Sequence, residues 1–479
     1  MARKNRERRR KTKTRPSSAS STSVPPPPPV NPEPQSGAAI DVLTGDGLDI
    51  LRRLSLAELP QPPPVKPEPQ PGAAIDALSG EDLREILRRL SLADLLRAAL
   101  ACHRWRRVAA RCLPRAPPLL GYFFHPVDTP PPPPIRPEPT HYGAVFAPLD
   151  ASSPRLSLDF APDASRFELY DSHQGLLLLE PAVPLPKSII PRLLVLDPAT
   201  RRSVLLPRPP RDTVPDDHRW RSSRYYVGSA LLSRAHPSKL CFEAVCFAID
   251  GGHPRAWVAS VDDGDCSWRA LSRDVDVLVD FDPHWFKSSC VHAAGKMYWH
   301  ICNSGRVLVL DPATLRFSYL RAPAVLSDHF YTYRIAEMPE DGRLCIMAMA
   351  SRSRQLQLWV RGEARCSDNG WLLERELVSM SVVWEAVPGL PRDWAQRVFN
   401  VWPSDMDAGR TGKVFIQTFG YGRYSLHPDT GKMERLETQD GKEYGHPIFA
   451  YFLAWPPAFL APEDVLTSCS LGAESATCV

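Results

Sequence analysis

The sequence lacks a long apolar run and an organised set of cysteines. No stretch of about 18 apolar residues occurs, and the longest candidate, residues 448–461, is interrupted by Pro456 and Pro457. This stretch predicts a buried strand followed by a segment that leaves the sheet, so no membrane partner is expected. The 11 cysteines are scattered without a CxxC pair, and the basic start runs into Ser and Pro instead of an apolar leader. We therefore expect free thiols and a location in the nucleus, the cytoplasm or both.

Catalytic and phosphate-binding motifs are also missing. The patterns GxSxG, HExxH and GxGxxG do not occur, and no complete Walker loop is present. The nearest phosphate-loop look-alike, residues 409–413, lacks the required spacing and the Ser or Thr, and it precedes a predicted strand. A strand offers no helix N-terminus to a phosphate. We therefore expect no enzyme, no catalytic residues and no cofactor.

One set of metal-ligating residue types surrounds a predicted turn. Cys290 and His292 alternate on one predicted strand, and His300 and Cys302 alternate on the next. Four such nitrogen and sulfur ligands would suit tetrahedral zinc. However, a tight turn would place Cys290 near Trp299, out of phase with His300. We therefore interpret the four as ordinary sheet residues and expect no metal. Cys290, His292, His300 and Cys302 are the weak alternative, a zinc site.

Proline and basic residues are abundant but concentrated near the start. Of the 52 prolines, 26 lie in the first 140 residues. Residues 1–15 hold nine Lys or Arg and one Glu, and subtracting this charge of +8 from the chain's +4 leaves −4 for the remainder. The basic run predicts either a nuclear-import signal or a solvated tail. Because the rest is acidic, nucleic acid is not an expected partner.

A near-duplication follows this tail. Residues 28–59 are almost repeated at 63–95, and a third echo at 132–139 holds only the proline-rich part. The first copy has Gly45 and Gly47 where a helix would begin, and glycine costs about 1 kcal/mol per helical site relative to alanine. We interpret the first copy as a truncated duplicate that does not dock well. A second docking site is the alternative.

Residues 76–113 show three short helical patterns. Ser79 with Asp82, and Ser91 with Asp94, are N-cap and first-turn signals for the first two. The apolar stripes are Leu83, Ile86, Leu87 and Leu90, then Leu92, Leu95, Leu96 and Ala99, and then Trp105, Val108, Ala109 and Cys112. Three such helices are expected to bury too little surface to close a dry core of their own. Their apolar faces therefore predict a docking partner, and a subdomain packed on the rest of the chain is the alternative.

This segment resembles an F-box, the motif that docks a receptor onto the Skp-type adaptor of cullin–RING ubiquitin ligases. The tail Cys102-His103-Arg104-Trp105-Arg106-Arg107 after two leucine-rich helices carries the resemblance. The resemblance implies an adaptor-binding surface at Leu78, Leu83, Ile86, Leu87, Leu90, Leu95, Leu96, Ala99, Cys102 and Trp105.

From residue 141 to about 461 the pattern changes to short alternating runs punctuated by Gly, Asp-Pro and Asp-Gly, which is typical of strands and turns. Leu196-Asp197-Pro198-Ala199-Thr200 recurs at 310–314 and more weakly at 427–430. Pro fixes φ in such a turn, and Asp or Thr can bond the turn backbone. Blades of about 40–50 residues would give about seven blades, with six to eight possible.

This half resembles the F-box-associated, kelch-like β-propeller region of plant F-box proteins. The resemblance is carried by residues 173–178, the Asp-Pro-Ala-Thr turns, residues 257–268 and residues 295–299. It implies loops that present a target protein to the ligase. The target itself is not readable from the sequence, because function lies in the site and not in the fold.

Together these features predict an α+β multidomain chain, with a small three-helix F-box followed by an all-β propeller-like domain and a disordered Pro-rich N-terminus. The predicted parts are a basic and Ser/Pro-rich tail (1–36), the truncated duplicate (37–60), a linker (61–71), the F-box (72–115), a second linker (116–140), the β-domain (141–461) and a flexible tail (462–479). The predicted function is a substrate receptor of a Skp–cullin–F-box ubiquitin ligase. The alternative is a nuclear β-propeller that binds nucleic acid or a ligand outside any ligase.

Overall fold

The computed structural model describes residues 78–456 except 91, 114–116, 129–141, 150–152, 184, 187–188, 210–223, 238, 288, 303, 327–332, 339–340, 351–354, 363–368 and 408–411. The predicted basic tail, truncated duplicate, first linker and C-terminal tail therefore lie outside the described residues, as does the N-cap predicted at Ser91. Among the described residues, no helix is both long and apolar enough to cross a membrane.

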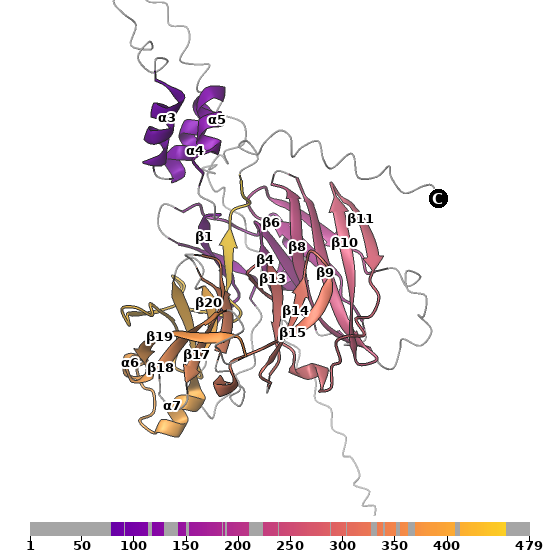
Figure 1. Ribbon diagram of the computed structural model, residues 1–479, viewed down its shortest axis with the longest axis vertical. Coiled ribbons are helices and arrows are strands. Elements are labelled where there is room, and N and C mark those ends of the chain that lie inside the picture. The colour runs from indigo at the N-terminus through magenta and orange to yellow at the C-terminus, as the bar shows by residue number, and fades with distance from the viewer. Residues whose placement is uncertain are drawn as a thin grey trace, which may run out of the picture. The chain divides into compact units, whose positions relative to one another are not determined.

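Three helices come first, as the three apolar stripes predict. They are α3 (Gly80–Arg88), α4 (Leu92–Ala101) and α5 (His103–Ala110). The rest of the described chain is almost entirely β-structure, as Figure 1 shows.

Five antiparallel sheets of four strands follow one another along the chain. The first contains β4 (Phe167–His173), β5 (Leu176–Pro181), β6 (Leu193–Asp197) and β7 (Arg202–Leu206), preceded by the 3₁₀ helix η1 (Pro162–Arg166). The second contains β8 (Arg224–His236), β9 (Cys241–Asp250), β10 (His253–Asp262) and β11 (Asp265–Ala270). The third contains β12 (Val291–Ala293), β13 (Lys296–His300), β14 (Arg306–Asp311) and β15 (Arg316–Arg321).

The fourth sheet contains β16 (Tyr333–Glu337), β17 (Leu344–Ala350), β18 (Gln355–Arg361) and β19 (Trp371–Ser379). The fifth contains β20 (Val401–Asp407), β21 (Lys413–Thr418), β22 (Arg423–Leu426) and β23 (Met433–Arg435). Between these two sheets lie the short helices α6 (Met380–Ala386) and α7 (Trp394–Asn400).

The sixth sheet has three strands and joins the two ends of the β-domain. Its order is β25 (Phe449–Phe452), β1 (Leu119–Phe124) and β3 (Val145–Pro148), and Figure 1 shows the yellow C-terminal strand beside β1. On one side Tyr122 packs against Phe415 of β21, with 5.3 Å between ring centroids. On the other side Tyr451 packs in one apolar cluster with Leu177 of β5. The six sheets therefore close into a ring, a six-bladed β-propeller.

The blade count corrects the expectation of about seven. The turn at Asp197 and the turn at Asp311 lie in the first and third sheets, so 114 residues separate two blades and not three. The long β8, of 13 residues, and β9 and β10, of 10 residues each, lengthen the second blade beyond the usual repeat. The count of six lies at the lower end of the range that the spacing allowed.

The predicted linker 116–140 is wrong in its first part. It contains β1 and the two-residue strand β2 (Pro126–Val127), which pairs with β24 (Glu443–Tyr444). Phe123 and Phe124 of β1 are completely buried. The run LLGYFF is apolar enough to form a buried strand, but prolines flank it on both sides and made the whole stretch read as a linker.

The Asp-Pro-Ala-Thr turns behave as the sequence predicts. Asp197 Oδ1 accepts hydrogen bonds from the backbone N–H groups of Ala199 and Thr200, both at 3.1 Å. Asp311 makes the equivalent two bonds in the third sheet, at 3.0 and 3.3 Å. The weaker echo at 427–430 joins β22 to β23. The three turns connect the third and fourth strands of the first, third and fifth sheets. Two blades therefore separate each turn from the next, which explains their spacing along the sequence.

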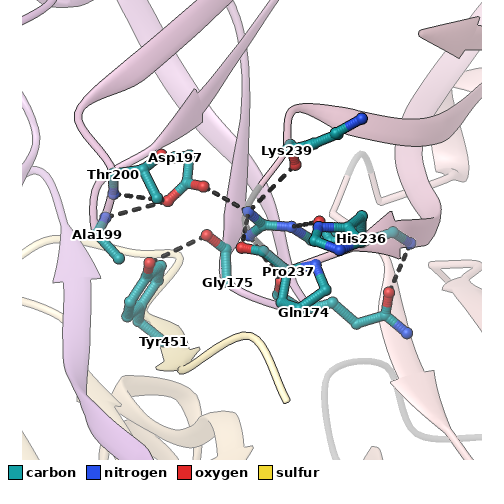
Figure 2. Close-up of polar contacts among 10 residues, drawn as sticks. Gln174, Gly175, Asp197, Ala199, Thr200, His236, Pro237, Lys239 and Tyr451 are labelled. Carbon is teal, nitrogen blue, oxygen red and sulfur yellow. Dashed lines mark hydrogen bonds and ion pairs between the residues drawn. The ribbon is translucent and has the colours of Figure 1, made fainter. Parts of the chain in front are cut away.

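A buried polar junction ties the first two sheets to β25 (Figure 2). Arg234 of β8 places its guanidinium 2.5 Å from the carboxylate of Asp197, and its backbone N–H donates to Gln174 Oε1 at 2.6 Å. The Tyr451 hydroxyl donates to the Gly175 carbonyl at 3.0 Å. Gly175 has φ +78, and a Cβ there would lie 2.8 Å from a backbone nitrogen of the C-terminal segment. Only glycine fits this close approach.

Candidate functional site

The first candidate site is the three-helix unit, which begins at a capping box on α3. The Asp82 backbone N–H donates to Ser79 Oγ at 3.1 Å, and the Ser79 backbone N–H donates to Asp82 Oδ2 at 3.1 Å. The Ser79 hydroxyl donates to the same carboxylate at 2.6 Å. These bonds satisfy backbone donors that the first helical turn leaves without partners. They also hold the pKa of Asp82 below its ordinary value.

The unit closes a small apolar core of its own, contrary to the expectation that it could not. Its fully buried members are Leu83, Leu87, Leu95, Ala99 and Ala109, and the side chains packed against them are Leu96, Ala98, Trp105, Val108, Ala110, Cys112 and Leu113. All of these residues belong to the helical segment itself. The i, i+4 spacing on α3 brings Leu83 and Leu87 to one face, which α4 and α5 cover.

Polar contacts from α5 and from the residues after it join the three-helix unit together. Arg104 donates to the carbonyl of Leu78, and Arg106 donates to the carbonyl of Ala99 at 3.4 Å. The Cys112 thiol lies 3.7 Å from the carbonyl of Arg84 and donates to it. Two of the arginines in the tail after the leucine-rich helices therefore help to hold the unit together.

The predicted adaptor-binding residues divide into three groups by exposure. Leu83, Leu87, Leu95 and Ala99 lie in the core of the unit, and Leu78, Leu96 and Trp105 are half-buried. Ile86, Leu90 and Cys102 are exposed, and the two aliphatic side chains leave 43% and 37% of their surface accessible. The structure thus shows which apolar side chains support the unit and which face outward.

Sequence reasoning missed one outward-facing side chain. Leu100 of α4 leaves 60% of its surface accessible, more than Ile86 or Leu90. Its signal was available, because it follows Leu96 by four residues and so shares its helix face. We name Ile86, Leu90 and Leu100 the exposed apolar set of the helical unit.

The helical unit also carries ion pairs on its surface. Arg84 pairs with Glu81 at 2.9 Å on α3, Arg89 at its C-cap pairs with Glu85 at 2.8 Å, and Arg97 pairs with Asp94 at 2.7 Å on α4. The partners in each pair are three or four residues apart. Exposed pairs at this spacing stabilise a helix by about 0.3–0.5 kcal/mol each. The surface of the unit therefore carries both charged and apolar side chains.

The second candidate site is a cavity of about 500 Å³ at the centre of the ring. The innermost strands β4, β12, β16 and β25 line it. Asp171 is almost completely buried and accepts from the Leu231 backbone N–H at 2.7 Å. His292 Nε2 lies 2.9 Å from the same carboxylate oxygen, and the His292 ring stacks on His173 with 4.1 Å between centroids. The first and third sheets are therefore braced across the ring.

The four metal-candidate residues are not gathered at one point. β12 and β13 pair Val291 with Tyr298, so Cys290 falls opposite Trp299, as the sequence predicts. Of the candidates, His292 faces Asp171, while His300 packs against Tyr333 with 5.4 Å between ring centroids. Within the described residues, no group of three or more His, Cys, Asp or Glu is placed to hold a metal. Burial raises the pKa of the Cys290 thiol well above its ordinary value, so it remains protonated.

Two family models match the chain. One, described as F-box protein AT5G49610-like, beta-propeller, matches residues 187–459. The other, described as F-box domain, matches residues 75–115, which contain the whole helical unit. No curated protein sequence matches the chain.

Several solved structures match the chain at low similarity. The Cps50 (Swd1) β-propeller domain of Myceliophteria thermophila is 13% identical, with 61% of this chain and 79% of that chain covered and a TM-score of 0.30. A DUF4784 family protein from Bacteroides caccae is 10% identical, with 66% and 70% covered and a TM-score of 0.35. At these scores neither likeness carries an argument about function.

Proposed function

The chain belongs to the family of F-box proteins with an AT5G49610-like β-propeller, and we propose that it is the substrate-receptor subunit of a Skp–cullin–F-box ubiquitin ligase. In this proposal the helical unit binds a Skp-type adaptor and through it a cullin–RING ligase, in the nucleus, the cytoplasm or both. The β-propeller recruits a target protein for ubiquitination.

The observation that carries the proposal is the exposed apolar set on a helical unit that has already closed its core. Ile86, Leu90 and Leu100 contribute nothing to that core, yet each leaves more than a third of its surface accessible. Burying a fully exposed aliphatic side chain contributes about 1.5–3 kcal/mol, and docking would bury the part of each side chain that is still accessible here. Exposed apolar side chains on a helical unit of this kind suit docking against an apolar surface of a partner.

The roles of the ten proposed adaptor-binding residues follow from their exposure. Ile86, Leu90 and Cys102 would contact the adaptor directly, and Leu78, Leu96 and Trp105 would contribute their accessible edges. Leu83, Leu87, Leu95 and Ala99 would act by holding the three helices in place. Leu100 joins the first group.

The chain's own contribution would be proximity and not chemistry. A receptor that holds a target beside the ligase raises the effective concentration of the target's lysines at the site of ubiquitin transfer. Other subunits would then carry out the transfer. This division of labour requires no catalytic residue in the propeller.

The experiment is an affinity purification of the full chain and of a chain that lacks residues 76–113. We expect the full chain to recover the Skp-type adaptor and a cullin, as scored by mass spectrometry, and the deleted chain to recover neither. Circular dichroism of the deleted chain controls for the fold of the propeller. Equal recovery of adaptor and cullin by both chains would refute the proposal.

A further inference from the structure

An open groove runs along the outer part of the first sheet, away from the central cavity. Its volume is about 560 Å³, and it is lined by η1, by the end of β5 and by β7. Apolar side chains form its floor, among them Phe160, Leu194 and Leu205. We name it the η1–β7 groove.

The groove lies on the face of the first sheet that packs against the sixth sheet. The first sheet has two apolar faces, and on the face toward the sixth sheet the inner residues Leu179 and Leu194 are 0% and 6% exposed. Leu205 is the register partner of Leu194 on β7, yet it is 46% exposed, and nearby Val183 is 71% exposed. Among the described residues, the sixth sheet has three strands where the other five have four. The outer part of the first sheet therefore keeps an apolar surface that no described strand covers.

Arginines line this apolar surface. Arg166, Arg192 and Arg208 all line the groove, and Asp163 is the acidic residue among its described lining. Arg166 lies 3.9 Å from Asp163, but both side chains are more than three-quarters exposed, so that pair is screened by solvent. The described lining therefore carries an excess of two positive charges over an apolar floor.

The adjacent strand edge favours an extended occupant. β7 is the outermost strand of its sheet and, within the described part of the chain, pairs with β6 alone. An exposed edge can accept an extended peptide as an added strand, with alternate side chains entering pockets beside it. Such a peptide could place apolar side chains against Leu205 while its carboxylates meet the arginines.

We propose that the η1–β7 groove binds an extended segment of the ligase target in which aliphatic residues alternate with, or lie beside, Asp or Glu. The inference rests on the proposed function only in naming the occupant as the target. The groove, its apolar floor and its charge are properties of the propeller alone.

The test selects ligands for the purified full chain from a displayed library of random octapeptides. We expect the enriched sequences to combine two or more Asp or Glu with Leu, Ile or Val. Fluorescence anisotropy with one enriched peptide then measures affinity for two variants of the groove. The double variant Arg192→Glu and Arg208→Glu should weaken binding at least tenfold, as should Leu205→Asp, while added salt should weaken binding to the unchanged chain.

Matched controls are available on the outermost strands of other sheets. Arg269→Glu on β11 reverses an exposed arginine, and Leu372→Asp on β19 changes a leucine that is 42% exposed. Neither should change peptide affinity. Because Arg192 and Arg208 are exposed, the double variant should fold even if Leu205→Asp does not.

Several results would overturn the inference. These are enrichment of basic peptides, unchanged affinity in the double variant, or binding only of a peptide copied from this chain's own residues 210–223, which would make the occupant internal. Adaptor recovery by the same variants is measured in parallel. Groove variants that recover the adaptor normally but no longer bind the peptide would support the groove as the binding site. If the unchanged chain recovers no adaptor, the proposed function is refuted, while the peptide-binding result for the groove still holds.

Discussion

Arg234 and Asp197 form an ion pair with 2.5 Å between guanidinium nitrogen and carboxylate oxygen, and 4% and 1% of their side chains are exposed. The pair joins β8 of the second sheet to the β6–β7 turn of the first. The guanidinium also donates to the backbone carbonyls of His236 at 3.0 Å and Pro237 at 2.7 Å, and the carboxylate accepts from two turn N–H groups. Nearly every polar atom of the pair therefore has a partner, which is what a buried charge requires.

Replacing Arg234 with Met should destabilise the propeller strongly. The Asp197 carboxylate would remain buried without its cation, and losing one partner of a buried pair costs about 3–5 kcal/mol. Urea unfolding followed by tryptophan fluorescence measures the shift of the midpoint.

The matched control for this variant is Lys296→Met on β13, whose side chain pairs with Asp311 of the Asp-Pro-Ala-Thr turn in the third sheet. Lys296 lies 3.4 Å from Asp311, and these side chains are 46% and 30% exposed. That pair should contribute at most about 1 kcal/mol. Equal midpoint shifts for the two variants would show that the buried Arg234–Asp197 pair contributes no more to stability than the exposed Lys296–Asp311 pair.

Replacing Phe123 with Ala should also be costly, because it empties a fully buried position in the strand that closes the ring. Removing a buried phenylalanine typically destabilises a protein by about 3–5 kcal/mol. The measurement is again the urea midpoint, with Val145→Ala on β3, at a position 38% exposed, as the control. A midpoint unchanged by Phe123→Ala would mean that residues 119–124 are a linker after all.

The three helices and the strands of the β-domain could be predicted from the sequence, because caps, turns and apolar periodicity are local sequence signals. Ser79 with Asp82 specified the start of α3, and the turn at Asp197 specified the link between β6 and β7. Ring closure was not readable, because β1 pairs with a strand about 330 residues away along the chain and no local pattern encodes that partner. The prolines on both sides of β1 favoured a linker over a strand in the sequence-based prediction.

The site could be predicted by residue type but not by exposure. The first predicted stripe holds Leu87, which is completely buried, and Ile86, which lies on α3 beside it and is 43% exposed, and a helical period alone cannot separate the two. The way α4 and α5 cover α3 decides it. The η1–β7 groove was invisible for a similar reason, since it lies on the face of the first sheet that packs against a sheet whose members are distant in sequence.

The thiols Cys102 and Cys290 should react very differently. Cys102 is exposed, whereas burial raises the pKa of the Cys290 thiol well above the ordinary value of 9.0. Because the thiolate is the reactive form, a raised pKa means that Cys290 stays protonated even at about pH 9. Iodoacetamide followed by peptide mass spectrometry should label Cys102 readily and leave Cys290 unmodified at both about pH 7.5 and about pH 9.

Addition of a Skp-type adaptor extends this prediction to the interface. If Cys102 lies in the docking surface, the bound adaptor should slow its alkylation at least about tenfold, as expected for a side chain removed from solvent. Cys266 on β11 is half-buried and provides the internal reference. Unchanged labelling of Cys102 in a saturated complex would place it outside the interface.

The most direct measurement is the affinity of the purified full chain for a purified Skp-type adaptor, by isothermal titration calorimetry. Ile86→Asp combined with Leu90→Asp leaves the buried core residues of the helical unit in place, and Leu372→Asp with Leu373→Asp changes two similarly exposed leucines on β19. If the exposed apolar set is the docking surface, the first pair should weaken binding at least about 100-fold, since two apolar contacts are lost and two carboxylates would have to be buried in their place, and the second pair should have no effect. Equal affinity of the first pair and the unchanged chain would contradict the receptor account.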